Sequence, residues 1–442
     1  MRASDATGRM PRVADAVCGG KADAGCVRHD GERSLMDRVI SAFGLFVMIG
    51  LAWLMSTHRR RFPWRVVLIG MVLQFAFAVL TLRTVPGRLL FDALGELFTK
   101  ILDFVDEGSR FVFGAEYTQH YFAFRVLPTI IFFSSLMSVL YYLGVMQRVV
   151  QAMAWVMQRT MKTSGAESLS TAANIFVGQT EAPLVVKPYV ARMTKSELMT
   201  IMIGGFATIA GGVLALYVGM GIDAGHLMTA SVIAAPATLV IAKIMQPEVD
   251  QPETAGVSAS SLPMTNVNLI DAAAEGASEG LKLALNVAAM LIAFLGLMAM
   301  LDWMLASIGE FYFGQKTWSL SAVFAHLFWP IAWVMGIPSQ DCSHAGELLG
   351  LRMVTNELVA YQRMSDWLNK PELGIKLAER SRDILTYALC GFANFGSIGI
   401  QIGGIGAMAP ERRGDLARLG LRAMLGGTLA CFMTACVAGV LL

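Results

Sequence analysis

The feature that most constrains this chain is a series of long apolar runs between residue 37 and the C-terminus. A helix needs about 20 mostly apolar residues to cross the hydrocarbon core of a bilayer. Only 15% of the residues are charged, whereas an ordinary soluble domain has about 25%. We therefore expect an all-α, polytopic membrane protein. The candidate spans are 37–56, 66–83, 121–146, 198–221, 228–245, 283–306 and 418–441.

The loops between these runs indicate an orientation in the membrane. The basic run Arg59-Arg60-Arg61 follows the first span, and an excess of Lys and Arg marks cytoplasmic loops. Residue 36 is then external, and the later loops alternate. The loop 362–383 comes out external although it is rich in basic residues, which acidic residues nearly balance. The net charge of +2 provides no basic face, so no nucleic-acid partner is expected.

Two stretches cannot be simple spans, because polar residues and prolines interrupt them. They are 164–197, with both ends on the cytoplasmic side, and 318–361, with both ends external. Broken backbone at membrane depth is tolerated only where protein or a wet cavity satisfies it. We expect each stretch to form a re-entrant hairpin, one from each side of the membrane.

A short internal repeat accompanies these hairpins. The segment Gly205-Phe206-Ala207-Thr208-Ile209 is echoed by Gly391-Phe392-Ala393-Asn394-Phe395, and each copy follows a polar–Glu pair, Thr180-Glu181 or Asn356-Glu357. The two copies have opposite orientations in the predicted topology. Inverted repeats with broken helices are typical of secondary transporters, whose sites lie at the repeat interface.

Glu181 and Glu357 are the strongest candidates for function, because an ionisable group at membrane depth costs at least ~2.5–3.5 kcal/mol. The alternative is that each pairs with a neighbouring hairpin or lies nearer the membrane interface. The segment before Glu181 is broken by Gly178 and Pro183 and is rich in side-chain donors and acceptors. A neutral, hydroxyl-rich solute suits it better than an anion, because we identify no intramembrane Arg or Lys as a counter-charge.

The breaks at Thr208-Ile209 and at Asn394–Ser397 offer backbone carbonyls together with hydroxyl or amide oxygens. Such oxygens are the ligands that a small hard cation prefers. The alternative for Thr208 is a hydroxyl that bonds back to its own helix, which is common for Thr in membranes. No HExxH or GxSxG motif occurs, so we do not expect an enzyme.

Three motifs then carry a family resemblance. The strings Gly178-Gln179-Thr180-Glu181-Ala182-Pro183-Leu184, Asn356-Glu357-Leu358-Val359-Ala360-Tyr361 and Cys390-Gly391-Phe392-Ala393-Asn394-Phe395 together resemble the concentrative nucleoside transporter family. The resemblance extends from Met36 to the C-terminus. It implies a cation-coupled nucleoside symporter with about eight spanning helices, two opposed re-entrant hairpins, inverted repeats and an elevator-like transport domain. It also implies a homotrimer.

The resemblance assigns roles to individual residues. Gln179, Thr180 and Glu181 would face the nucleobase with Val213 beneath it, whereas Glu357, Asn394 and Ser397 would hold the ribose hydroxyls and Phe392 would pack at the edge of the base or sugar. The family's sodium site would be formed by Asn174, Thr208 and the carbonyls of Val177 and Ile209.

The coupling ion has two candidates. Some bacterial members use protons and replace the Glu-Ala-Pro-Leu stretch, which this chain keeps at 181–184. This favours sodium, with the proton as the alternative, and no other cofactor is expected. The chain departs from the family at Gly396 and Thr208, where Ser is common, and in the segment 336–341, which bears on gating and selectivity.

We therefore predict a symporter that imports nucleosides across a bacterial inner membrane, with nucleosides and the lipid bilayer as its partners. A carrier for a sugar or an amino acid, and a receptor that binds nucleosides without moving them, are the rivals. The preference for purine or pyrimidine stays open. The expected parts are a disordered or mis-started tail (1–35), scaffold helices (36–163), the first hairpin and transport helices (164–245), a cytoplasmic linker and scaffold helix (246–317), and the second hairpin and transport helices (318–442).

Overall fold

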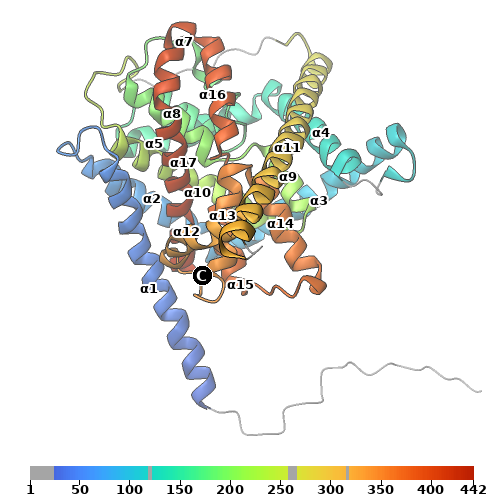
Figure 1. Ribbon diagram of the computed structural model, residues 1–442. Coiled ribbons are helices and arrows are strands. Elements are labelled where there is room, and N and C mark those ends of the chain that lie inside the picture. The colour runs from blue at the N-terminus through green and yellow to red at the C-terminus, as the bar shows by residue number, and fades with distance from the viewer. Residues whose placement is uncertain (1–23, 118–121, 257–265, 315–317) are drawn as a thin grey trace, which may run out of the picture. The chain divides into compact units, whose positions relative to one another are not determined.

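The computed structural model describes residues 24–442 except 118–121, 257–265 and 315–317 (Figure 1). The chain divides into two units, Met1–Met36 and Asp37–Leu442, and the second contains all the features discussed below. Most of the predicted tail 1–35 lies outside the described residues. The first helix begins inside that stretch, at Ala24, well before the predicted start of the first span at residue 37.

Every regular element in the described parts of the chain is a helix, as the composition predicts. In chain order, the α-helices are α1 (Ala24–Leu54), α2 (Trp64–Leu82), α3 (Val85–Phe113), α4 (Leu127–Tyr142), α5 (Val145–Met161), α6 (Gly165–Ala173), α7 (Lys187–Val190), α8 (Lys195–Ala207), α9 (Gly211–Gly219), α10 (Ala224–Met245), α11 (Leu269–Phe313), α12 (Leu320–Val334), α13 (Cys342–Val354), α14 (Glu357–Asn369), α15 (Glu379–Leu389), α16 (Phe395–Met408) and α17 (Arg413–Leu441). A π-turn, η2 (Phe122–Val126), precedes α4, and short 3-10 turns lie at η3 (Ala182–Val186), η4 (Pro371–Leu373) and η5 (Pro410–Arg412).

Six helical stretches among the described residues are long and apolar enough to cross a membrane, and each coincides with a predicted span. The seventh predicted span, 283–306, lies inside the long helix α11. The stretches differ in burial. The windows in α8–α9 and in α10 are each 89% buried, whereas those in α1 and α2 are each 28% buried. The broken helix α8–α9 and its neighbour α10 therefore form the core, and α1 and α2 present mostly exposed apolar surface.

Both predicted helix breaks are present, but only the first lies where the sequence predicts. Helix α8 ends at Ala207 and α9 begins at Gly211, so the break covers Thr208-Ile209. Helix α15 ends at Leu389 and α16 begins at Phe395, so the second break covers 390–394 and the predicted bounds, Asn394–Ser397, are wrong: Asn394 caps α16, and the next three residues form its first turn. The second break is stabilised by Asn394, whose side chain accepts a hydrogen bond of 2.8 Å from the backbone N–H of Ser397, because an N-cap satisfies an otherwise unpaired donor of the first turn.

The first predicted hairpin is a helix pair with an irregular tip. Ser164 and Glu167 form a capping box that begins α6, and the tip at 174–181 leads into η3, which packs back against α6. The second predicted hairpin has different bounds. Its stretch, 318–361, contains α12, α13 and only the first turn of α14. Asn356 caps α14, whose first residue is Glu357, and α13 packs against α14. The predicted stretch therefore begins before this helix pair and ends inside it.

The order of the helices along the chain repeats in two blocks. The first block runs α6 and η3, then the broken helix α8–α9, then α10; the second runs α13 and α14, then the broken helix α15–α16, then α17. Helices α8, α10 and α17 pack on one another, so the two blocks share one core. The helix–break–helix pattern therefore occurs twice around it (Figure 1).

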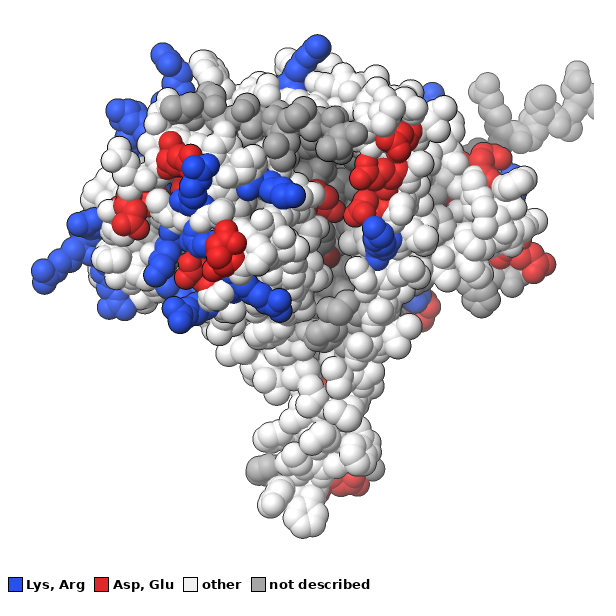
Figure 2. All heavy atoms as spheres, turned by 90° about the horizontal axis from the view of Figure 1, so that it is seen from above, with Lys and Arg blue, Asp and Glu red and all other residues white. Residues whose placement is uncertain are grey.

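Helices α4 and α11 make a separate close contact outside this core. A Cβ atom added to Gly276 would lie 2.7 Å from the Ser134 carbonyl oxygen, and one added to Gly280 would lie 2.7 Å from Ile131 Cα. Small residues permit this approach of two backbones inside a membrane. Lys and Arg side chains gather over one part of the end of the molecule where α7 lies and α17 begins (Figure 2).

Candidate functional site

The Glu357 carboxylate lies where α14 begins and meets groups from both repeats. Its Oε1 accepts a hydrogen bond of 2.9 Å from the Tyr217 hydroxyl on α9, and its Oε2 accepts one of 3.3 Å from Asn394 Nδ2. Glu357 is 4% exposed, and a carboxylate in the first turn of a helix is stabilised by the helix dipole. The structure thus joins Glu357 to Asn394 as predicted and adds Tyr217.

A second set of bonds links the tip of the first hairpin to α16. Gln179 Nε2 donates to Ser397 Oγ at 3.1 Å, and Gln179 Oε1 accepts from Gln401 Nε2 at 3.1 Å. Because Ser397 also donates its backbone N–H to Asn394, the contacts run without interruption from Gln179 to Glu357. These four predicted substrate residues therefore lie in one polar chain that crosses from the first repeat to the second.

The other predicted substrate residues are placed less directly. Thr180 packs against α16, where a Cβ added to Gly404 would lie 2.8 Å from Thr180 Cγ2. Glu181 is exposed, and its carboxylate lies against Gly178. Phe392 is half-buried, and its backbone N–H donates to the Thr208 carbonyl at 3.3 Å. Val213 is buried in α9, and the described contacts do not tie its side chain to the polar chain.

The predicted cation residues lie where two helices end. Asn174 terminates α6 and Thr208 terminates α8, and the C-terminus of a helix carries a partial negative charge that favours a cation. The segments that follow the two helix ends contact each other. The Gly211 N–H donates to Phe176 O at 3.1 Å, and Gly178 packs against Ala210, since a Cβ added to Gly178 would lie 3.4 Å from the Ala210 methyl group. Val177 and Ile209 belong to the same two breaks.

The side chains at these ends fit a cation in part. Asn174 is fully buried, and within the described part of the chain neither Oδ1 nor Nδ2 has a hydrogen-bond partner. A buried polar atom normally has a partner, and an amide oxygen is a suitable ligand for a hard cation. The Thr208 hydroxyl donates to Gly204 O at 2.9 Å. It therefore bonds back to its own helix, which was the alternative for this residue, and its oxygen keeps lone pairs that can accept.

The premise that no intramembrane Arg or Lys is available is wrong. Arg352 on α13 is 1% exposed, and Lys243 near the end of α10 is 6% exposed. Arg352 donates to Ala388 O at 2.7 Å and to Gly391 O at 3.2 Å, at the C-terminal end of α15. Both cations are bound by other groups of the chain, so neither is a free counter-charge for an anion. The neutral solute stays a prediction.

Three polar residues of this region, Tyr217, Gln401 and Arg352, are not among the predicted site residues. Tyr217 is four residues after Val213 on the same helix face, and Gln401 is four residues after Ser397 in an otherwise apolar run. Arg352 is a lone charge in an apolar stretch shortly before Glu357. A scan at helical spacing from the motif residues finds the first two, and a search for isolated charges finds the third.

Together these features define a class of protein. Two sets of broken helices pack on one core. They bring together a chain of polar side chains that includes the Glu357 carboxylate and two helix ends with a buried, unpartnered amide. This is the arrangement of a secondary transporter.

Comparison with known proteins identifies the family. Three family descriptions match successive parts of the chain: "Na+ dependent nucleoside transporter N-terminus" at 43–116, "Nucleoside recognition" at 123–224 and "Na+ dependent nucleoside transporter C-terminus" at 226–439. The chain belongs to the Na+-dependent nucleoside transporter family, a family of transporters and not of enzymes. This confirms the resemblance that its motifs indicate.

Individual relatives agree with this assignment. Solute carrier family 28 member 3 of Eptatretus stoutii is 45% identical over 92% of this chain and 61% of its own length. Sodium/nucleoside cotransporter 1 of Mus musculus is 42% identical over 92% of this chain and 64% of its own. An uncharacterized transporter of Haemophilus influenzae is 44% identical over 92% of this chain and 98% of its own. The chain thus spans about three fifths of the length of the vertebrate relatives and nearly all of the bacterial one.

Solved structures show the same fold. A structure of CNTnw in an inward-facing substrate-bound state has a TM-score of 0.85 and 42% identity, covering 91% of this chain and 97% of that one. A variant of CNTnw in an outward-facing state has a TM-score of 0.86 and 42% identity, covering 92% and 97%.

Proposed function

We propose that this protein is a sodium-coupled symporter that imports nucleosides. The observation that carries the proposal is the polar chain from Gln179 to Glu357, which joins the two repeats beside helix ends suited to a cation. Family membership and the name of the mouse relative, a sodium/nucleoside cotransporter, support both the substrate class and the ion.

The nucleoside would be bound by neutral and acidic groups of opposite repeats. Vicinal ribose hydroxyls would donate to Glu357, replacing or joining the bonds from Tyr217 and Asn394, because hydrogen bonds to a charged acceptor contribute about 1.5–3 kcal/mol each. The Gln179 amide offers both a donor and an acceptor to the edge of a base, with Thr180 and Glu181 on the same tip. Val213 and Phe392 would supply apolar contacts to the rings.

Sodium would be bound where α6 and α8 end. The Asn174 amide oxygen, the Thr208 hydroxyl oxygen and the carbonyls of Val177 and Ile209 would be its ligands. Binding there would fix the first hairpin against the α8–α9 break and so place Gln179 for the nucleoside. The coupling is reciprocal, because each ligand then raises the affinity of the other.

The finer parts of the proposal concern movement and assembly. We propose about eight spanning helices, two opposed re-entrant hairpins, and an elevator-like displacement of the repeated core against a scaffold that includes α4 and α11. The homotrimer and the bacterial inner membrane are part of the same proposal. The basic end of the molecule (Figure 2) would face the cytoplasm by the positive-inside rule.

The first experiment is uptake of labelled uridine into proteoliposomes at fixed pH, with and without an inward sodium gradient. Accumulation above the outside concentration that requires sodium supports the proposal. Uptake that follows a proton gradient instead would overturn the ion. Binding of uridine without accumulation would favour a receptor. If the protein transports a sugar or an amino acid and excess uridine or adenosine does not compete, nucleosides are not its substrates.

The Glu357→Gln variant tests the ribose contact. We expect uridine affinity to fall about 100-fold, equal to ~2.7 kcal/mol, because the charged acceptor is lost while the shape remains. Isothermal titration in detergent measures this, and size-exclusion chromatography checks folding. Glu347→Gln is the matched control, since Glu347 pairs with the exposed Arg363 at 3.3 Å away from the site. Unchanged affinity in Glu357→Gln would sink the assignment.

A further inference from the structure

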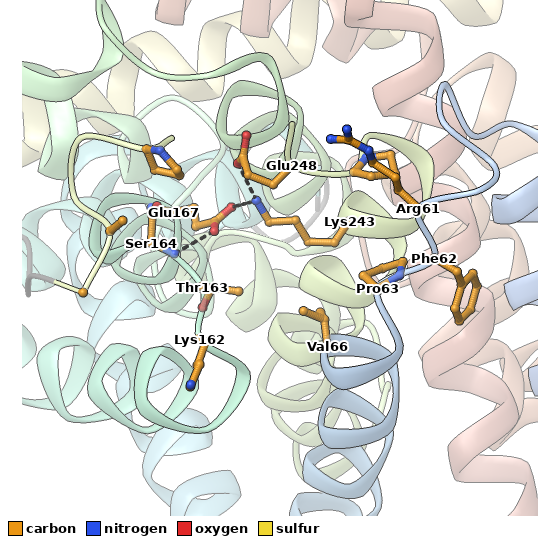
Figure 3. Close-up of a pocket in the computed structure, with 14 residues that line it drawn as sticks. Arg61, Phe62, Pro63, Val66, Lys162, Thr163, Ser164, Glu167, Lys243 and Glu248 are labelled. Atoms are coloured by element: carbon orange, nitrogen blue, oxygen red, sulfur yellow. Dashed lines mark hydrogen bonds and ion pairs between the residues drawn. The ribbon is translucent and has the colours of Figure 1, made fainter. Parts of the chain in front are cut away.

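A buried ion pair lies at the cytoplasmic end of α6 and α10, beside a cavity of about 370 Å³ (Figure 3). Lys243 extends from α10 between Glu167 and Glu248, with its Nζ 2.7 Å from Glu167 Oε2 and 3.1 Å from Glu248 Oε2. Lys243 and Glu167 are almost fully buried, and such charges require each other. Arg61 and Lys162 also line the cavity.

Helix α8 connects this cavity to the predicted cation site. Ser196, Thr200, Gly204 and Thr208 recur every four residues, which places them on one helix face. At one end the Ser196 hydroxyl accepts from Lys243 Nζ at 2.9 Å. At the other end is Thr208, a predicted cation ligand. All four residues are buried, so the stripe is an interior feature.

Helix α6 carries polar groups over the same distance. Glu167, Thr171 and Asn174 are spaced as i, i+4 and i+7 and therefore share one face, with Ser170 beside them. The hydroxyls of Ser170 and Thr171 are fully buried and have no hydrogen-bond partner in the described parts of the chain. Buried hydroxyls of this kind are normally satisfied by water or by an ion.

Helix α10 completes the enclosure. The Thr238 hydroxyl is fully buried and also without a partner among the described residues. Gly204 lies next to both Thr238 and Asn174, since a Cβ added to it would be 3.6 Å from Thr238 Cγ2 and 3.0 Å from Asn174 Nδ2. Unpartnered polar atoms from two helices thus flank a glycine on the third.

We propose that these groups form a polar seam through which the coupling cation leaves its site for the cytoplasm. The seam consists of Glu167, Ser170, Thr171, Asn174, Ser196, Thr200, Gly204, Thr208, Thr238 and Lys243. Its hydroxyls replace part of the hydration shell of the cation and order the waters that accompany it. The inference rests on the proposed function, because it concerns the path of the same ion.

Lys243 has a specific place in this route. Its ammonium lies between Glu167 and Glu248 and offsets one of their two negative charges, so these carboxylates hold a departing sodium ion less strongly than they would alone. Arg61 and Lys162 on the cavity wall act in the same direction. The route therefore ends in a region of low affinity, which suits release.

The test compares Thr171→Val and Thr238→Val, which remove a hydroxyl at nearly constant volume. Thr434→Val is the matched control, because Thr434 is buried in α17 and its hydroxyl bonds to Ala430 O within its own helix. Exchange of ²²Na⁺ in proteoliposomes measures passage of the ion, and the sodium-dependent rise in the melting temperature of the purified protein measures equilibrium binding. We expect each seam variant to slow exchange about tenfold, equal to ~1.4 kcal/mol.

The sodium-dependent rise in the melting temperature distinguishes residues that line the path of the ion from residues that bind the ion at equilibrium. We expect Thr171→Val to keep the sodium-dependent stabilisation, whereas Thr434→Val should match the wild type in both measurements. Exchange in both seam variants equal to that of Thr434→Val would overturn the seam. The seam would also be overturned if Thr171→Val lost the sodium-dependent stabilisation and its ²²Na⁺ exchange slowed no more than this loss of binding explains, because Thr171 would then be a ligand of the bound ion. A wild-type protein without sodium dependence would instead overturn the proposed function, and it is measured before any variant.

Discussion

The two repeats treat the end of their broken helix in different ways. In the first repeat, α8 ends at Ala207 beside Asn174, whose buried amide has no partner within the described residues. In the second, α15 ends at Leu389 beside Arg352, whose guanidinium donates to Ala388 O and Gly391 O. Both helix ends attract positive charge. At the first end we propose a removable cation, sodium, beside the unpartnered Asn174 amide, whereas the second end has a covalently attached cation, the Arg352 guanidinium.

This difference shows how two similar repeats can respond differently to one ion. The second repeat is held together whether or not an ion is present, because its cation belongs to α13. If sodium binds at Asn174 as proposed, the first repeat gains its positive charge only together with the ion. On that proposal the ion alters the order of the segment 174–181 and leaves the half that contains Glu357 unchanged, so one repeat responds and the other stays fixed.

The largest effect is expected when the guanidinium of Arg352 is removed from the second repeat. Arg352→Met loses two hydrogen bonds to carbonyls and a contact of 3.1 Å from Nη2 to Cys431 Sγ. We expect the free energy of unfolding to fall by about 3 kcal/mol, measured by denaturation in detergent, with or without sodium. Arg352→Lys should retain part of this stability because it keeps the charge.

Arg352→Lys also tests whether the two repeats act independently in sodium binding. The sodium concentration for half-maximal uridine binding should change less than twofold in Arg352→Lys, since Asn174 is untouched. Arg363→Met is the control, because Arg363 is half-exposed and its ion pair with Glu347 lies near the surface, where such a pair contributes about 0–1 kcal/mol. Its guanidinium also lies over the ring of Trp367, away from the Arg352 contacts. A large change in sodium affinity in Arg352→Lys would show that the repeats are not independent.

The next prediction concerns the removable cation. Asn174→Ala deletes the buried amide oxygen, and we expect the sodium concentration for half-maximal uridine binding to rise at least about tenfold, or ~1.4 kcal/mol. Folding should survive, because the amide has no partner to lose among the described residues. Titration with sodium at constant ionic strength measures the change, and Asn369→Ala on the exposed end of α14 is the control. Unaltered sodium dependence would disprove the site.

The smallest effect is expected at Tyr217. Tyr217→Phe removes the hydroxyl that bonds Glu357 and keeps the ring, which lies 4.4 Å from the ring of Tyr361 between centroids. We expect about fivefold weaker uridine affinity, since one hydrogen bond contributes about 1 kcal/mol. Tyr361→Phe is the comparison, because its hydroxyl donates to Thr386 O and not to Glu357. Equal losses in both variants would indicate general loosening of the region.

The sequence predicts most of the architecture because the bilayer restricts it so strongly. Apolar runs locate the spanning helices, and the Gly-Phe-Ala-polar segments locate both breaks. The bounds of the second helix pair are harder to predict. Gly336, with φ of +85°, forms the turn between α12 and α13, and together with Pro338 it resembles a hairpin tip in sequence. The turn at Thr355-Asn356, between α13 and α14, carries no such signal.

The site is predictable only in part, for a related reason. Motif residues such as Gln179 and Glu357 are recognisable by type and position. Their partners are not, because the Tyr217–Glu357 bond joins residues 140 positions apart and depends on how the repeats pack. Arg352 is missed because its partners are backbone carbonyls, which no sequence pattern displays.

The glycines that join α4 to α11 also have a mechanical consequence. Ser134 fits against Gly280 and Gly276 so closely that any added side chain would overlap it. Sliding one helix along the other would move Ser134 away from these two glycines, where its side chain fits because α11 has no Cβ. The α4–α11 contact therefore resists sliding, and we expect a large displacement within the molecule to occur along other contact surfaces.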